Sequence, residues 1–436
     1  MDDWWLISVD DHVIEPEHVW QARLPQRFRE RGPRWVRDDT GPAWIYEDVR
    51  VPVNATVTGA ANIESGSMPP IFEPLDFEQI NPACYDPAAR VRAMDADHVL
   101  SSILFPNLPR FCGQLFAEGD DKDLGLLCVK AYNDWMIEEW CASAPGRFIA
   151  NVLIPLWDPS EGARELERCA DRGARAFCFS QAPHRLGLPS IHDQDGYWNP
   201  VFSTANDTGM VVCTHLGSAS QLPDTAPDAP IMVSTTLLQF AGQETLLDWL
   251  FGRPFDSFPN LRVCLSENGI GWMPAVLEVA EWFMEAGRRG QPAPGQRAEL
   301  PAVDSSGREV KGFLGAGNAS DLARMTNARS GGFDLRARFR EHIFGCFIKD
   351  DHGVRTLDEL GVDNIMMESD FPHMSSSYPN TAEAAARALA PLDDGQRRKL
   401  LTDNAARLFN WEKELDAVQA VVSRGARPRP KAADPS

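Results

Sequence analysis

Acidic and imidazole side chains end several apolar runs of this sequence, where a polar group needs a partner. A carboxylate is costly to bury unless it is paired or binds a metal ion. Two imidazoles and two carboxylates suit Zn²⁺, the ion we expect, with Mn²⁺ the alternative because half of the ligands are hard oxygens. The proposed ligands of this single divalent ion are Asp10, His12, His215 and Asp370.

The spacing of the first two residues favours a shared ion. Side chains alternate along a strand, so Asp10 and His12 point to the same side. Alone, this pair is better explained as a loop acid beside a surface histidine, and His215 alone fits a histidine that is satisfied at the rim of a sheet. The segments are more specific together, because all of them lie at expected carboxyl ends of strands.

The last apolar run carries three candidate groups, Glu368, Asp370 and His373. Glu368 and Asp370 are expected to face one way, and His373 follows in the turn. The alternative is that Asp370 caps the next helix, but Pro372 separates it from the next helical pattern. We expect Asp370 to serve both as a ligand and as a catalytic base.

These groups need a framework that gathers the ends of distant strands. Short apolar runs alternate with helical patterns, which is typical of a parallel sheet built from βα units. The predicted fold is α/β, a (β/α)₈ TIM barrel with long loop insertions at its carboxyl face. The expected strands are Leu6–His12, Val99–Pro106, Phe148–Pro155, Ala174–Ser180, Met210–His215, Leu261–Glu267, Ile343–Ile348 and Asn364–Asp370. The expected helices are Pro87–Asp95, Lys122–Ser143, Pro159–Arg172, Trp198–Thr208, Thr245–Phe251, Pro274–Ala286, Gly353–Leu360, Ala382–Ala390 and Asp394–Phe409.

The chain is expected to form one domain over residues 1–423, followed by a disordered tail at 424–436. Three segments are insertions that do not fit the βα repeat: 17–85, 218–243 and 288–332. The first two should overhang the face where such barrels bind substrates. The third is open between a lid, an oligomer contact and a partly disordered loop.

Composition narrows the class of partner to a small molecule. The net charge of −21 argues against nucleic acid, because phosphate binding needs clustered Lys and Arg. We see neither a membrane span nor a secretory signal, and therefore expect a cytoplasmic protein. The nine cysteines contain no CxxC pair and are expected to be reduced and mostly buried.

Six segments carry a family resemblance: Asp10–Pro16, Asp86–Asp95, Pro145–Phe148, Thr214–Gly217, Glu267–Trp272 and Glu368–His373. They resemble the amidohydrolase superfamily, in particular the branch of amidohydrolase family 2 that is similar to aminocarboxymuconate-semialdehyde decarboxylase. The resemblance covers most of residues 6–410. It implies one metal ion bound by two residues of the first strand, a histidine of the fifth and an aspartate of the eighth, and homodimers as the common assembly.

The chain departs from that resemblance at the sixth strand. Many relatives have a histidine there, whereas this strand ends at Glu267. A glutamate can accept a proton or bind a water but cannot act as a cation. We expect Glu267 and His373 to orient a water or a leaving group; the alternative for Glu267 is a supporting role beside a ligand or a pairing with an arginine.

Three further residues near the expected mouth are weaker candidates. Glu15 lies three residues after His12 and could support the ligands, but a loop acid is the simpler interpretation. His184 and His192 follow the fourth strand, where substrate contact and simple exposure are both open.

The first functional hypothesis is a mononuclear metal-dependent hydrolase. A bound metal ion would activate a water, and Asp370 would take its proton and pass it to the leaving group. The substrate would be a bulky ester, lactone, amide or acyl thioester, or a molecule with a C–C bond next to a carbonyl.

Two alternatives remain open at this point. One is a non-oxidative decarboxylase of an aromatic or unsaturated carboxylic acid, which the missing histidine at the sixth strand counts against. The other is a barrel without enzymatic activity that keeps a structural metal ion.

Overall fold

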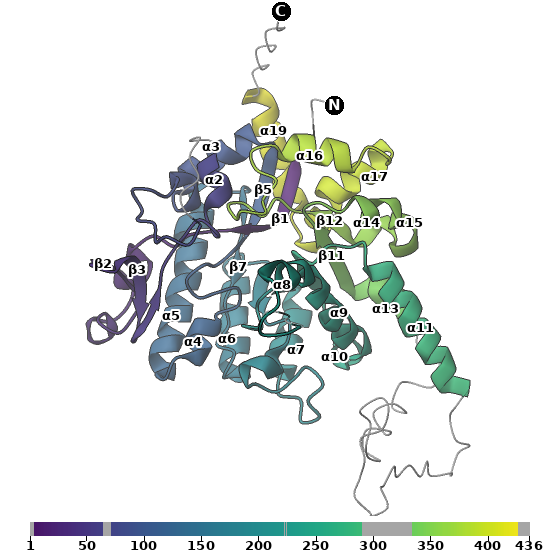
Figure 1. Cartoon of the computed structure of the whole chain (residues 1–436), viewed down its shortest axis with the longest axis horizontal. Helices are drawn as coiled ribbons and strands as arrows, with labels where there is room; N and C mark the ends of the chain where they lie inside the picture. The colour runs from purple at the N-terminus through teal and green to yellow at the C-terminus, as the bar shows by residue number, and fades with distance from the viewer. Residues whose placement is uncertain (1–3, 64–70, 222, 224, 290–333, 426–436) are drawn as a thin grey trace, which may run out of the picture.

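The computed structural model describes residues 4–63, 71–221, 223, 225–289 and 334–425. Its centre is a barrel of parallel strands in which each strand pairs with the next one along the chain (Figure 1). The third strand is interrupted at Ala150 and is described as two short pieces, β6 and β7. The barrel strands are β1 Leu6–His12, β5 Val99–Phe105, β6 Phe148–Ile149, β7 Asn151–Val152, β8 Ala176–Phe179, β9 Val211–His215, β10 Val263–Ser266, β11 Ile343–Phe347 and β12 Ile365–Met367.

Backbone hydrogen bonds close the ring between its first and last strands. Asp370 N donates to Asp10 O at 2.8 Å, and His12 N donates to Phe371 O at 2.6 Å. The segment that continues β12 therefore completes the barrel beside β1. The predicted (β/α)₈ barrel is confirmed, and every predicted strand overlaps an observed one.

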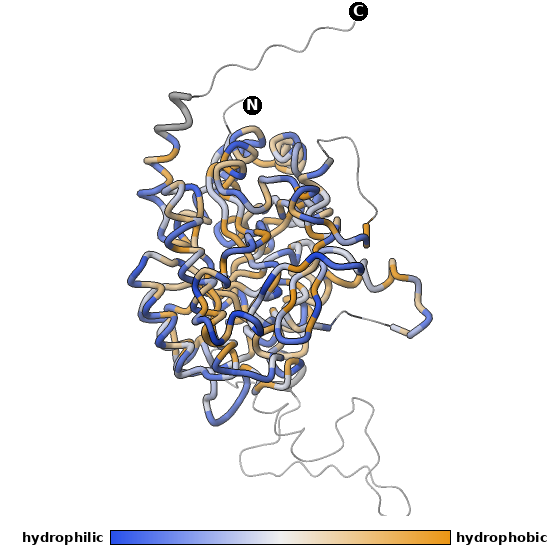
Figure 2. Tube along the Cα trace, turned by 90° about the vertical axis from the view of Figure 1, so that its left-hand side faces the viewer, coloured by the Kyte–Doolittle hydropathy of each residue, from blue (hydrophilic) through white to orange (hydrophobic). Residues whose placement is uncertain are grey.

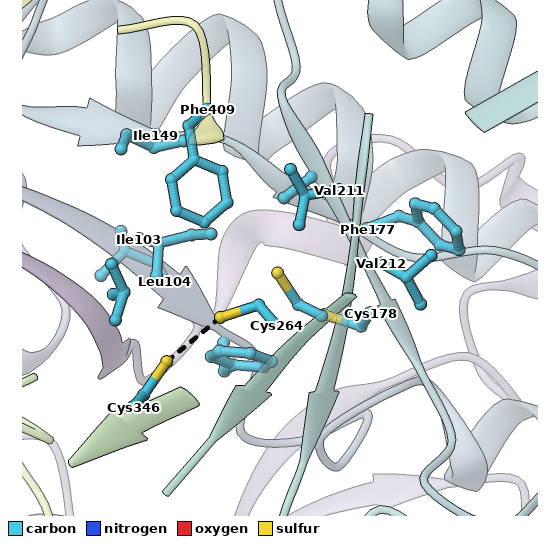
Figure 3. Packing of buried hydrophobic residues seen from close by; sticks show 14 of the residues in the cluster. Ile103, Leu104, Ile149, Phe177, Cys178, Val211, Val212, Cys264, Cys346 and Phe409 are labelled. Carbon is cyan, nitrogen blue, oxygen red and sulfur yellow. Dashed lines mark hydrogen bonds between the residues drawn. The ribbon is translucent and has the colours of Figure 1, made fainter. Parts of the chain in front are cut away.

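The barrel strands are buried along their whole length, which explains their near-continuous apolar sequences. In Figure 2 the hydrophobic stretches run through the body of the trace, and the loops around it are mostly hydrophilic. Inside the barrel a layer of cysteines packs against aliphatic side chains, and the Sγ atoms of Cys264 and Cys346 lie 3.2 Å apart (Figure 3). The nine cysteines are free, and all except Cys141 are buried, as expected.

Helices surround the barrel, and most of them agree with the predicted patterns (Figure 1). Asp side chains cap several N-termini, and Pro87 and Pro159 occupy first turns, where the missing N–H costs nothing. The helices are α1 His18–Gln21, α2 Gly59–Ile63, α3 Pro87–Ala96, α4 Gln114–Glu118, α5 Lys122–Trp135, α6 Pro159–Ala170, α7 Asn199–Thr208, α8 Ile231–Leu237, α9 Gly242–Phe251, α10 Pro254–Ser257, α11 Met273–Arg289, α13 Leu335–His342, α14 Asp351–Arg355, α15 Leu357–Leu360, α16 Thr381–Ala388, α17 Asp394–Arg398, α18 Asn404–Leu408 and α19 Glu412–Gly425.

The insertions contain structure that the sequence patterns did not predict. Residues 17–85 include an antiparallel sheet with the order β2–β3–β4, formed by Arg34–Asp38, Gly41–Tyr46 and Val49–Val51. Figure 1 places β2 and β3 on the outer side of α5. Residues 218–243 include the short helix α8.

Two predictions fall wholly or largely outside the described residues. These are the third insertion at 288–332 and the tail at 424–436. The single domain at 1–423 stays a prediction. Among the described residues, no helix has the length and apolar character that crossing a membrane requires.

Candidate metal centre

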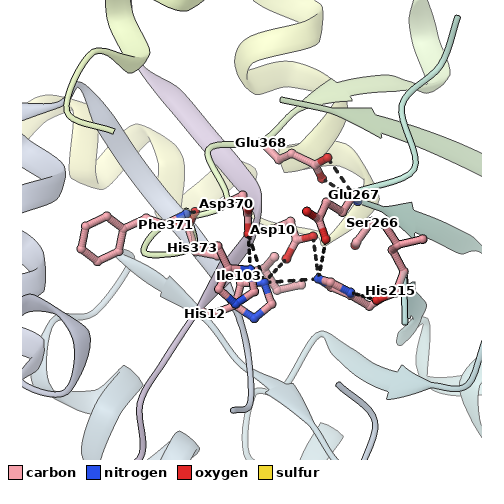
Figure 4. A network of polar contacts seen from close by, with 12 residues as sticks. Asp10, His12, Ile103, His215, Ser266, Glu267, Glu368, Asp370, Phe371 and His373 are labelled. Carbon is pink, nitrogen blue, oxygen red and sulfur yellow. Dashed lines mark hydrogen bonds and ion pairs between the residues drawn. The ribbon is translucent and has the colours of Figure 1, made fainter. Parts of the chain in front are cut away.

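The predicted ligands meet at the carboxyl ends of the barrel strands (Figure 4). The Nε2 atoms of His12 and His215 lie 3.2 Å apart. Asp10 lies between the two imidazoles, with Oδ1 at 3.4 Å from His12 Nε2 and Oδ2 at 3.2 Å from His215 Nε2. These three side chains come from β1 and β9 and are all buried.

The fourth predicted ligand, Asp370, joins this group from the segment after β12. Its Oδ1 lies 3.3 Å from His12 Nε2 and 2.9 Å from His373 Nδ1. The ring of His373 stacks on that of His12 at a centroid distance of 3.6 Å. The hydroxyl of Ser375 donates a hydrogen bond to Asp370 Oδ2.

The donor atoms of this cluster fit a divalent cation. Both carboxylate oxygens of Asp10 are buried and have no hydrogen-bond donor. Asp370 Oδ1 is also buried and has only imidazole nitrogens beside it, those of His12 and His373. His215 Nδ1 lies 2.5 Å from its neighbour's carbonyl oxygen, Leu216 O, which keeps the proton on Nδ1 and directs the Nε2 lone pair at the cluster. Carboxylate oxygens that have no donor and face two imidazole nitrogens are costly to bury unless a positive ion lies among them.

Burial sets the protonation of the two imidazoles. It lowers the pKa of His12 and, less strongly, that of His215, so both rings favour the neutral form that binds metal ions. Burial, reinforced by the nearby Asp370, raises the pKa of Asp10. A bound cation would remove the cost of ionising Asp10, because it would stabilise the charged carboxylate.

Asp370 and His373 behave as an ion pair. Burial opposes the charge of Asp370, but His373 and His12 outweigh it and hold the pKa of the carboxyl below its usual value. Burial likewise opposes the charge of His373, and Asp370 outweighs it and raises the pKa of the imidazole. Asp370 therefore favours the protonated form of His373 beside it.

Glu267 lies at the edge of the cluster, directly after β10. Its Oε2 is 3.8 Å from His215 Nε2, and Ser375 Oγ lies 3.5 Å from its Oε1. Burial, with Asp370 nearby, raises the pKa of Glu267 to about 7. Its backbone N–H donates to both carboxylate oxygens of Glu368, at 3.2 and 3.3 Å.

The backbone is strained at two of these residues. Glu267 and Asp370 both have positive φ, at 59° and 57°. A residue with a side chain adopts this conformation at a cost, and such residues concentrate at functional sites. Glu267 directly follows β10 and Asp370 lies three residues after β12, and each turns its carboxylate toward the cluster.

Several residues near the centre were not predicted, or were predicted without a definite role. Glu15 is fully buried, and its carboxylate accepts the backbone N–H groups of Asn107 and Leu108, so it is more than a loop acid. Phe111 stacks on the ring of His215, and no spacing pattern in the sequence marked it.

The other histidines lie away from the cluster or serve packing. His192 is exposed and pairs with Asp248 at 2.9 Å, and His184 is exposed. His342 is buried against Phe255 with its Nδ1 2.9 Å from Leu261 O. These residues take no part in the candidate centre.

Comparison with known proteins identifies one family and one kind of relative. A family model described as amidohydrolase matches residues 51–411. A gamma-resorcylate decarboxylase of Polaromonas sp. is 31% identical over 42% of this chain and 55% of its own length. A gamma-resorcylate decarboxylase of Rhodococcus jostii is 24% identical over 74% of this chain and 87% of its own length.

Solved structures share the fold at low sequence identity. An amidohydrolase from Mycobacterium avium subsp. paratuberculosis has a TM-score of 0.65 and 19% identity, and covers 94% of this chain and 98% of its own. A dihydroxybenzoic acid decarboxylase from Polaromonas sp. with bound manganese and 2-nitroresorcinol has a TM-score of 0.53 and 17% identity, over 93% of this chain and 97% of its own.

These relatives overturn the prediction of a hydrolase. The curated proteins similar to this chain are decarboxylases, so the ester, lactone, amide and thioester substrates have no support. The prediction gave too much weight to the absence of a histidine at the sixth strand, where Glu267 lies within reach of the same cluster.

Proposed function

Because this chain belongs to the amidohydrolase family, we propose that it is a metal-dependent decarboxylase of an aromatic carboxylic acid. One observation carries the proposal: the buried carboxylate oxygens of Asp10, which have no hydrogen-bond donor, face the Nε2 atoms of His12 and His215 beside the Asp370–His373 pair. The similarity to gamma-resorcylate decarboxylases supports the substrate class.

Asp10, His12, His215 and Asp370 would hold one divalent ion. In a chain of net charge −21, that ion would supply a positive centre for an anionic oxygen of the substrate. We propose Mn²⁺ as the first ion to test, because a dihydroxybenzoic acid decarboxylase of this fold was solved with manganese. Zn²⁺, the ion expected from the ligand types, is the second.

The reaction needs a proton at the carbon that loses its carboxylate. The C–C bond breaks, its electron pair stays on the ring carbon, CO₂ leaves, and a proton takes its place. His373 stores that proton 2.9 Å from Asp370 Oδ1, and Asp370 would deliver it to the ring carbon. Glu267, with a pKa of about 7, would accept a hydrogen bond or a proton from a ring hydroxyl.

The test is CO₂ release by the metal-loaded enzyme. Protein loaded with Mn²⁺ or Zn²⁺ would be incubated with 2,6-dihydroxybenzoate, 5-carboxyvanillate and other hydroxybenzoates, and the CO₂ and the phenol would be measured together. We expect equal amounts of the two products from at least one acid. A stoichiometrically loaded protein that releases no CO₂ from any of these acids would rule the proposal out.

A further inference from the structure

We propose that Phe111 makes the site specific for a planar aromatic acid, because its ring forms an apolar wall beside the metal ligands. This inference rests on the proposed function and adds the residue that selects the substrate class. Phe111 lies in the loop between β5 and α4, far in sequence from the strand ends that supply the ligands.

The ring of Phe111 is placed with respect to three imidazoles. It lies parallel to His215, with 4.1 Å between centroids and 5° between planes. It is nearly perpendicular to His12 and His373, at 5.8 Å and 6.5 Å. The ring therefore forms one side of a corner that also contains the imidazoles of His12, His215 and His373.

A second phenylalanine shows that Phe111 is more than packing. Phe105 also contacts His215, at 4.9 Å and 67°, and is fully buried in the core. Phe111 is only partly buried, although it has the closer and more parallel contact. Core packing is thus supplied by Phe105, whereas Phe111 keeps part of its surface accessible.

Two loops are joined by hydrogen bonds that hold Phe111 in place. The carboxylate of Glu15 accepts the N–H groups of residues 107 and 108, at 2.9 Å each. Gln114 Nε2 donates to Gly217 O at 3.3 Å, and Cys112 Sγ lies 3.5 Å from Ser218 O. The buried carboxylate of Glu15 thus positions the loop that carries Phe111, which indicates that the orientation of the Phe111 ring matters.

Because Gly217 has no side chain, the Phe111 ring can lie close to it. A Cβ atom at this position would lie 3.1 Å from Phe111 Cε2, and its φ of +83° disfavours any residue with a side chain. The residue after the ligand-bearing turn of β9 thus allows the close approach of Phe111 to His215. Aromatic rings gain from parallel or edge contacts with other rings, so the same surface suits a flat aromatic acid.

The experiment compares binding of an aromatic and a non-aromatic ligand to the Mn²⁺-loaded protein by calorimetry. 2-Nitroresorcinol serves as an aromatic probe that cannot lose CO₂, and oxalate as a planar anion without a ring. Phe111→Leu removes the ring but keeps an apolar side chain, and Phe111→Tyr keeps the ring. Metal content is measured for every variant.

We expect Phe111→Leu to weaken nitroresorcinol binding about tenfold, Phe111→Tyr to restore it, and oxalate binding to stay within about twofold. Equal weakening of both ligands, unchanged nitroresorcinol binding in Phe111→Leu, or no binding by the wild type would overturn the inference. Because this readout needs no turnover, ring-dependent binding without CO₂ release would reject the proposed reaction while retaining the role of Phe111.

Discussion

Asp10 and Asp11 are adjacent on one strand and equally buried, yet their surroundings are opposite. Neither oxygen of Asp10 has a hydrogen-bond donor. Asp11, on the other side of the strand, accepts hydrogen bonds from Ser8, Ser102 and Ser369 and from the backbone N–H of Phe371. One carboxylate is left for an ion that the chain does not supply, and its neighbour is satisfied by the protein.

The same division holds for the other buried acids around the barrel mouth. Asp370 Oδ1 faces the imidazole nitrogens of the cluster, whereas Glu15 and Glu368 accept backbone N–H groups. Burial alone does not identify a ligand, because all three of these acids are buried. The backbone N–H donors separate the two groups: Asp11, Glu15 and Glu368 accept them, whereas the side chains of Asp10 and Asp370 face the cluster instead.

The largest effect should follow from removing a ligand acid. Asp370→Asn and Asp10→Asn keep the size of the side chain but lose its charge, so we expect Mn²⁺ content to fall and activity to drop by about 10³-fold or more, or at least ~4 kcal/mol of transition-state stabilisation. Elemental analysis and CO₂ release measure the two effects. Full metal content in both variants would remove the distinction between the two groups of acids.

The next effect is a pH dependence of stability that comes from Glu15. Burial raises the pKa of Glu15 from 4.5 to about 7, so the folded state holds its proton more tightly than the unfolded chain. The stability that this proton contributes is complete below pH 4.5 and is lost as the pH rises through 7, on the order of 3 kcal/mol in all.

Urea unfolding at pH 5 and pH 8 tests whether the stability falls as the pH rises. The wild type should lose more stability between the two pH values than Glu15→Gln, which cannot ionise. Other buried acids titrate in both proteins, so the difference between the two losses is the informative quantity. Equal losses would mean that Glu15 is ionised at low cost in the folded protein.

A smaller effect is expected for Asp11, which serves as the control for Asp10. Asp11→Asn should keep Mn²⁺ content near the wild-type value but lower the free energy of unfolding by about 2 kcal/mol, because an amide nitrogen cannot accept the hydrogen bonds that the carboxylate accepts. Urea unfolding and elemental analysis check both parts. Loss of metal without loss of stability would assign Asp11 to the site.

The smallest effect on stability is expected from a substitution in the buried cysteine layer inside the barrel. Cys346→Ala removes one sulfur from the buried cysteine layer, and we expect about 1 kcal/mol of destabilisation and unchanged Mn²⁺ content. Cys264→Ala is the matched variant, since it removes the other sulfur of the 3.2 Å contact. Metal loss in either would extend the metal site into the cysteine layer.

The barrel could be predicted because its strands are buried on both faces and so appear as apolar runs. The sheet β2–β3–β4 could not, because strands such as Arg34–Asp38 are half exposed and rich in charge. The segment after β12 was predicted as strand up to Asp370, whereas the ladder ends at Met367 and Asp370 has positive φ. Local sequence does not encode that turn.

In the site, the residues predicted from strand ends, including Glu267 and His373, do come together, because the fold gathers those ends at one face. Phe111 was missed since a loop aromatic has no periodic signal, and the role of Glu15 depends on a loop about 90 residues away. The reaction class was predicted wrongly, because one residue type at one strand end does not determine which bond breaks.

The hydrogen bonds that close the barrel also bear on the order of events during synthesis. Asp10 and His12 leave the ribosome early, but their backbone partners in the segment 370–371 leave it hundreds of residues later. Until then the nascent chain has an open sheet edge and an incomplete set of ligands. Closure of the barrel and completion of the proposed ligand set therefore depend on the same late segment, and until it is made the open edge is exposed to aggregation and proteolysis.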